Sequence, residues 1–158
     1  MTTYYVNQKF SLKDQFSILD ANQEEVFTAE AESLVALTKK IMLRTMAGEE
    51  LLLIDEKFNW FLPRFEFYIG DERICEMKSE FAWFKKKYTI VTPDWQIEGD
   101  IWDHQYEIKE GNETIATIRK EFFSWMDAYE INVFYEDYTE LILGIVIAID
   151  ADLSDDDN

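Results

Sequence analysis

Short segments that alternate between apolar and polar residues fill most of the chain, and turn residues separate them. Residues 64–69 alternate in this way, Gly70 and Asp71 supply a hairpin turn, and residues 73–78 form the partner segment. We predict about a dozen strands, at the spacing typical of a β-barrel or sandwich. The clearest of the remaining strands are predicted at residues 87–91, 95–99, 104–109, 114–118 and 129–133.

An unbroken apolar segment, residues 141–149, lies near the end of the chain between two acidic residues. A segment that is apolar on every side must be surrounded on every side. Its many Ile and Val residues favour a strand. Its length, the presence of Gly144 and the acidic residues at 136, 137 and 140 favour a helix. The residue pattern alone leaves both structures open.

A short aromatic or aliphatic segment followed by an alternating strand recurs along the chain. The copies begin at Phe58, Phe81 and Phe122, with a fainter aliphatic copy at Leu34. Because the copies are unevenly spaced, the repeat does not fit a solenoid or a propeller. We interpret it as one hairpin corner used several times around a closed sheet, with aromatic side chains plugging the barrel ends. Residues 30–37 also fit a helix as a secondary alternative.

Composition and charge narrow the class of protein. The 158 residues suffice for one domain, and a hydrophobic content of 47% excludes a disordered chain. A net charge of −18 repels phosphates, so we expect no nucleic-acid partner. Cys75 is the only cysteine, which indicates a reducing compartment. We see no signal peptide and no apolar run of the roughly 20 residues that a membrane span needs, so we expect a cytoplasmic protein.

Several segments resemble the LURP-one-related family, whose fold is similar to the tubby C-terminal domain and the phospholipid scramblases. The resemblance lies in residues 10–16, 61–65, 95–100 and 129–131 and in the closing apolar run that ends at Asp150. It implies a mainly β fold, a closed antiparallel barrel of twelve strands around a hydrophobic C-terminal helix at about residues 137–152. The whole would form a single domain, residues 1–153, followed by an acidic disordered tail at residues 154–158.

The resemblance also implies candidate functions. Tubby domains bind phosphoinositide headgroups through basic surface residues, and scramblases move lipids in response to calcium. Here Lys85, Lys86 and Lys87 are the only concentrated positive charge, and they lie beside Trp83. Lysines next to an interfacial aromatic are typical of a lipid-headgroup site. The alternative is a solvated loop whose aromatic residues point into the barrel.

The other candidate residues give weaker support for a functional site than the lysines do. Residues 136–140 occupy the place of the acidic calcium-binding stretch of scramblases but lack its ligand spacing. Asp150 and Asp152, with Asp155, Asp156 and Asp157, could bind calcium weakly, but we favour their interpretation as a solvated acidic tail. His104 is the only histidine and lies in a predicted strand, which argues against a metal or acid–base site. Burial beside an acidic neighbour argues against a Cys75 thiolate. We therefore expect no enzyme, no metal and no cofactor.

The sequence thus predicts a non-catalytic binding or scaffold module whose ligand is unknown, with an unidentified protein or lipid as its partner. The alternative is a peripheral membrane protein that binds phosphoinositide or anionic phospholipid headgroups, with calcium neutralising its acidic surface. We expect a monomer or a weak homo-oligomer.

Overall fold

The computed structural model describes residues 1–158 except 9–14, 33–37, 60–61, 84, 124–125 and 157–158. The described residues form β-strands and one long α-helix that follows a short 3₁₀ helix, η1. The strands are β1 (Thr2–Gln8), β2 (Gln15–Leu19), β3 (Glu25–Ala31), β4 (Lys40–Thr45), β5 (Glu50–Asn59), β6 (Leu62–Ile69), β7 (Glu72–Ala82), β8 (Lys85–Thr92), β9 (Trp95–Asp100), β10 (Gln105–Glu110), β11 (Glu113–Phe123) and β12 (Met126–Val133). The helices are η1 (Glu136–Tyr138) and α1 (Thr139–Asp156).

The strands form one 12-stranded antiparallel sheet in the order β8-β7-β6-β5-β4-β3-β2-β1-β12-β11-β10-β9. Strands that follow each other in the chain pair in the sheet, except β8 and β9. The first strand, β1, also pairs with the last, β12, where Tyr4 lies opposite Ile131. The edge strands are therefore β8 and β9, which lie beside each other without hydrogen-bonded pairing in the described part of the chain. The predicted twelve-stranded barrel is confirmed, and it is nearly closed, with a seam between β8 and β9.

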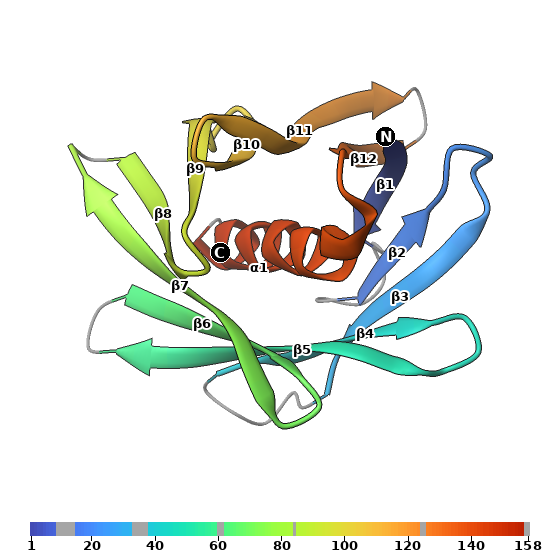
Figure 1. The fold of residues 1–158 in the computed structure, drawn as a ribbon, viewed down its shortest axis with the longest axis horizontal. Helices are drawn as coiled ribbons and strands as arrows, with labels where there is room; N and C mark the ends of the chain where they lie inside the picture. The colour runs from blue at the N-terminus through green and yellow to red at the C-terminus, as the bar shows by residue number, and fades with distance from the viewer. Residues whose placement is uncertain (9–14, 33–37, 60–61, 84, 124–125, 157–158) are drawn as a thin grey trace.

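The apolar run lies in α1, which the strands surround (Figure 1). Each residue from Leu141 to Leu153 is buried. The inner face of the barrel supplies the other half of the core, with Phe16, Phe65 and Phe67 among its largest side chains. The helical alternative is confirmed for this segment.

Backbone hydrogen bonding explains why a segment so rich in Ile and Val is helical. The backbone hydrogen-bonding groups of the wall strands lie within the sheet, so an extended segment inside the barrel would leave its own N–H and C=O groups without partners. A helix satisfies them within the segment. Gly144 permits close packing against the wall, because a Cβ at this position would lie only 2.3 Å from Leu52 Cδ2.

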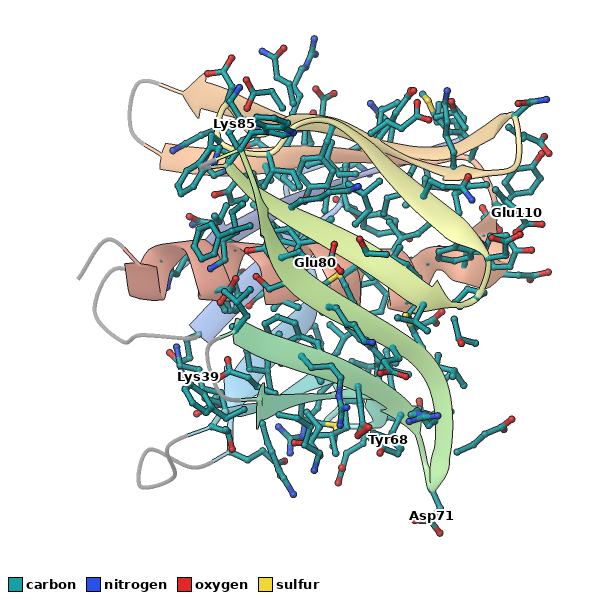
Figure 2. The ribbon with its side chains drawn as sticks, turned by 90° about the vertical axis from the view of Figure 1, so that its left-hand side faces the viewer. Lys39, Tyr68, Asp71, Glu80, Lys85 and Glu110 are labelled. Carbon is teal, nitrogen blue, oxygen red and sulfur yellow. The ribbon has the colours of Figure 1, made fainter. Side chains whose placement is uncertain are left out.

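The barrel has two distinct ends. α1 starts near the end that carries the β6–β7 and β10–β11 turns, since the rings of Trp95 and Tyr138 meet edge-on at a centroid distance of 5.0 Å and Tyr135 donates a hydrogen bond to Glu113. It ends beneath the β7–β8 hairpin, where Lys86 contacts Asp152. Figure 2 shows Lys85 and Lys39 at this second end, and Asp71 and Glu110 at the first. We call the second the helix C-terminal end.

Two boundaries differ from the predictions. The helix continues past Asp152 to Asp156, because Leu153 still packs against the core, so residues 154–156 belong to its last turn rather than to a separate tail. Residues 30 and 31 belong to β3, and residues 33–37, the rest of the secondary helical alternative, lie outside the described residues. None of the described helices has both the length and the apolar character that crossing a bilayer requires.

Candidate functional site

The three consecutive lysines at the start of β8 do not share a face. Lys85 and Lys87 are exposed, whereas Lys86 and Tyr88 are buried, as the alternation of a strand dictates. The Lys86 ammonium lies 2.6 Å from the Asp152 carboxylate, with the two side chains 2% and 6% exposed. Tyr88 donates a hydrogen bond to the same carboxylate oxygen. The predicted headgroup site is therefore divided, with Lys86 inside the barrel and Lys85, Lys87 and Trp83 on the surface.

Asp152 occupies a position where a negative charge is costly. It lies near the C-terminus of α1, where the helix dipole is negative, and it is removed from water. A buried carboxylate in this place requires a cation and hydrogen-bond donors. Lys86 and Tyr88 supply both, so β8 and the end of α1 are joined by a charged contact.

Asp150 belongs to a second polar group at this end. Tyr129 donates a hydrogen bond to it, and the His104 ring meets Tyr129 edge-on at a centroid distance of 5.1 Å. Burial, and secondarily the Asp150 charge, raise the pKa of Tyr106 far above its usual range. Asp150 and Asp152 are thus buried, and their interpretation as part of a solvated acidic tail is wrong, because both still belong to the helix inside the barrel.

A groove opens on the seam between the two edge strands. Its volume is about 320 Å³, and Lys85, Lys86 and Lys87 line it from β8. The opposite wall comes from the end of β9 and the turn after it, and consists of Ile97, Gly99, Asp100, Ile101 and Trp102. The groove thus combines cationic side chains with an apolar wall. The lysines could be recognised in the sequence but this wall could not, because no local signal shows that β8 and β9 are the two edges of the sheet.

Gly99 shapes the far wall of this groove. Its φ is +126°, and a Cβ here would lie 2.5 Å from the Gln105 carbonyl oxygen and 2.7 Å from Tyr106 Cα. Only glycine combines this conformation with such a close approach of two backbones. β9 and β10 therefore come together at this point, and the chain turns outward through Ile101 and Trp102.

Large apolar side chains are exposed near the hairpin tips at the helix C-terminal end of the barrel. Trp83 is 94% exposed, and Phe58, Phe81 and Trp102 are also exposed. We call Phe58, Phe81, Trp83, Lys85, Lys87 and Trp102 the rim. The prediction that the corner aromatics plug the barrel is wrong for Phe58, Phe81 and Trp83, because α1 already fills the interior. Trp60, Phe61, Phe84 and Trp125, which belong to the same repeat, lie outside the described residues.

The other candidates from the sequence, His104, Cys75 and residues 136–140, do not form a catalytic or metal-binding group among the described residues. His104 lies in the turn before β10 with φ of +54°, rather than in a strand. Burial, with a smaller contribution from Glu76, raises the pKa of the Cys75 thiol to about 12, so it stays protonated at neutral pH. Residues 136–140 lie at the opposite end of the barrel, where Thr2 donates a hydrogen bond to Glu136. Among the described residues, no three His, Cys, Asp or Glu side chains are arranged to hold a metal ion.

Comparisons with known proteins agree with this architecture. The chain matches the LURP-one-related family profile over residues 2–150. It is 30% identical to YxjI, an uncharacterized protein of Bacillus subtilis (strain 168), over 159 aligned positions that cover 100% of this chain and 98% of that protein. Its fold is similar to an X-ray structure of a protein from Arabidopsis thaliana, with a TM-score of 0.69, 14% identity, and coverage of 94% of this chain and 89% of that one.

Proposed function

The chain belongs to the LURP-one-related family, and we propose that it is a non-catalytic binding module that contacts its partner through the rim. The chemistry of the interior supports a non-catalytic role. Cys75 is a buried, protonated thiol, and the buried carboxylates of Asp150 and Asp152 are engaged by tyrosines and, at Asp152, by Lys86. These groups serve packing and charge compensation.

The observation that carries the proposal is the conformation of Trp83. This residue is 94% exposed at the tip of the β7–β8 hairpin and has φ of +53°. A bulky residue in the left-handed region costs about 1–2 kcal/mol, and so exposed a side chain gains little from packing. Its placement costs stability rather than adding to it, which is typical of residues held for binding.

Site-specific photo-crosslinking in cells tests the rim as a contact surface. We would place a benzophenone side chain at Phe81, on the rim, and in a control at Met46, an exposed residue of the β4–β5 turn at the opposite end. We expect a crosslinked product from position 81 and none from position 46, and we expect that product to disappear when Trp83→Asn is added. Asn tolerates positive φ, so this change preserves the hairpin. Equal products from both positions, or none from position 81, would contradict the proposal.

An anionic membrane surface is the second candidate partner, and the lysines beside Trp83 favour it. Lys85 and Lys87 point outward, and none of the side chains that the structure describes forms an ion pair with them. An aromatic ring with adjacent free ammonium groups suits the headgroup region. Three lysines are few for a polybasic site, and Lys86 is not available at the surface, so we expect weak binding.

Vesicle flotation tests this second candidate. Purified protein would be mixed with phosphatidylcholine vesicles and with vesicles that also contain phosphatidylglycerol, each with and without calcium. Headgroup binding is supported if the protein floats only with the vesicles that contain phosphatidylglycerol and if the Lys85→Gln/Lys87→Gln variant no longer does so. Flotation that needs calcium assigns the contact to carboxylates instead, and no flotation in any condition rejects the membrane candidate.

A further inference from the structure

We propose that the groove on the β8–β9 seam is a ligand site for a small amphiphilic anion, a molecule with one carboxylate or phosphate group and an apolar chain. The inference deepens the proposed function, since it supplies a ligand for the end of the barrel to which the rim belongs. It rests on the composition of the groove, its place in the fold and the charges around it.

The position of the groove follows from the topology. Around the rest of the barrel, neighbouring strands are joined by hydrogen bonds, and α1 fills the interior. At the seam β8 and β9 are not paired, so side chains rather than a backbone ladder line the space between them. A volume of about 320 Å³ is at the lower end of the range for small-molecule pockets, about 300–1,000 Å³.

The β8 wall of the groove selects a negative group. It presents Lys85, Lys86 and Lys87, whereas the described residues of the opposite wall include one carboxylate, Asp100, which accepts a hydrogen bond from the Asp103 backbone N–H. Lys86 is held in place by Asp152, and Lys85 and Lys87 at the mouth have no ion pair among the described residues. An anion at the mouth of the groove therefore meets the ammonium groups of Lys85 and Lys87, whereas the charge of Lys86 is compensated by Asp152.

The β9 wall selects an apolar chain. Ile97 and Ile101 line the groove beside Trp102, which is partly exposed at its edge. Gly99 brings no side chain into the space between them. A ligand whose charged group lies near Lys85 and Lys87 can therefore cover these apolar side chains with its tail, and burial of that surface contributes to affinity.

Isothermal titration with sodium decanoate tests the proposal, because decanoate carries one carboxylate and one saturated chain. Acetate and decyltrimethylammonium are the comparison probes, since the first lacks the chain and the second reverses the charge. We expect saturable binding of one decanoate per protein below its micelle concentration, and no measurable binding of either comparison probe. Binding of decyltrimethylammonium as tight as that of decanoate would overturn the proposal.

Binding measurements on variants test whether decanoate binds in the groove. Lys85→Gln/Lys87→Gln should raise the Kd for decanoate at least about tenfold, and Trp102→Ala should also raise it. Lys40→Gln/Lys78→Gln removes the same charge from exposed positions on β4 and β7 outside the groove and should leave the Kd unchanged. Each of these lysines is exposed, so the changes should not prevent folding. An unchanged Kd in Lys85→Gln/Lys87→Gln would overturn the groove assignment.

The test is independent of the rim experiments. Decanoate binding that depends on Lys85 and Lys87 supports the groove even if no product is obtained from the crosslinker at Phe81. Flotation with phosphatidylglycerol vesicles without binding of monomeric decanoate overturns the groove proposal and leaves the membrane candidate intact.

Discussion

Lys86 reaches inward from an edge strand of the barrel and forms an ion pair with Asp152, 2.6 Å away near the end of the central helix. Tyr88, two positions along the same strand, donates a hydrogen bond to the same carboxylate oxygen. Because β8 has a hydrogen-bonded neighbour on only one side, this contact ties the free edge to the helix that fills the barrel. The pair therefore stabilises the wall of the groove that carries the lysines.

We predict that breaking this pair is strongly destabilising. Lys86→Met leaves the Asp152 charge buried without its cation, and loss of one partner of a buried pair costs about 3–5 kcal/mol. The double variant Lys86→Met/Asp152→Leu removes both charges and should recover most of that loss. Urea denaturation measures the free energy of unfolding of each variant.

Lys87→Met is the matched control, because Lys87 is the next residue along the strand and points outward. It should change the free energy of unfolding by no more than about 0.5 kcal/mol. A double variant as unstable as the sum of its single variants would show that Lys86 and Asp152 do not act as a pair.

Gly144→Ala tests the packing of the helix against the barrel wall. The added Cβ would lie 2.3 Å from Leu52 Cδ2 and 3.4 Å from Phe67 Cδ1. Alanine favours a helix by about 1 kcal/mol over glycine, whereas overpacking a core costs about 1–3 kcal/mol. Because Leu52 and Phe67 are themselves fully buried, we expect overpacking to dominate and the thermal midpoint to fall. A raised midpoint would show that the wall yields at Leu52.

Gly99→Ala should be more damaging than Gly111→Ala. At Gly99 an alanine would have φ of +126° and would clash with backbone atoms of Gln105 and Tyr106. At Gly111 φ is +61° and the space around an added Cβ is open. The expected losses are more than about 2 kcal/mol at Gly99 and about 1 kcal/mol at Gly111. Equal losses in chemical denaturation would contradict the close approach of β9 and β10.

Stability should fall at alkaline pH because of Cys75. The pKa of its thiol is raised from 9.0 to about 12 in the folded protein, so the unfolded chain loses this proton first. The stability that depends on the neutral thiol is complete below pH 9 and is lost as the pH rises from about 9 to about 12. Each such group contributes a slope of up to about 1.4 kcal/mol per pH unit. Cys75→Ala should reduce the slope, and an unchanged slope would contradict the assignment.

Much of the fold could be predicted because its signals are local. Alternation and Gly70–Asp71 located the β6–β7 hairpin, and the apolar run located the segment that the barrel surrounds. Whether that run is a strand or a helix could not be decided from its residues, because the answer depends on the interior of the barrel offering no backbone partners to an extended segment. The resemblance to the family indicated the helix, and the structure confirms it.

The candidate site was harder to predict because it depends on the direction of single side chains. Three adjacent lysines look alike in the sequence, yet strand alternation sends Lys86 inward while its two neighbours face solvent. Likewise, Asp150 and Asp152 follow the apolar run as a polar tail would, but continuation of the helix keeps them inside the barrel. The wall containing Trp102 depends on a contact between strands that the sequence does not specify.

The most direct test of the central claim, that the groove at the helix C-terminal end of the barrel binds an amphiphilic anion, is an NMR titration of the tryptophan indole N–H signals with decanoate. Trp102 lies in the groove and Trp83 on the rim, whereas Trp95 is buried at the opposite end, where its indole N–H donates a hydrogen bond of 2.8 Å to Glu110. Assignment would come from single Trp→Phe variants. We predict a saturable shift of the Trp102 signal, with the Trp95 signal unmoved. A shift of Trp95 as large as that of Trp102, or no shift of Trp102 at saturating decanoate, would contradict the claim.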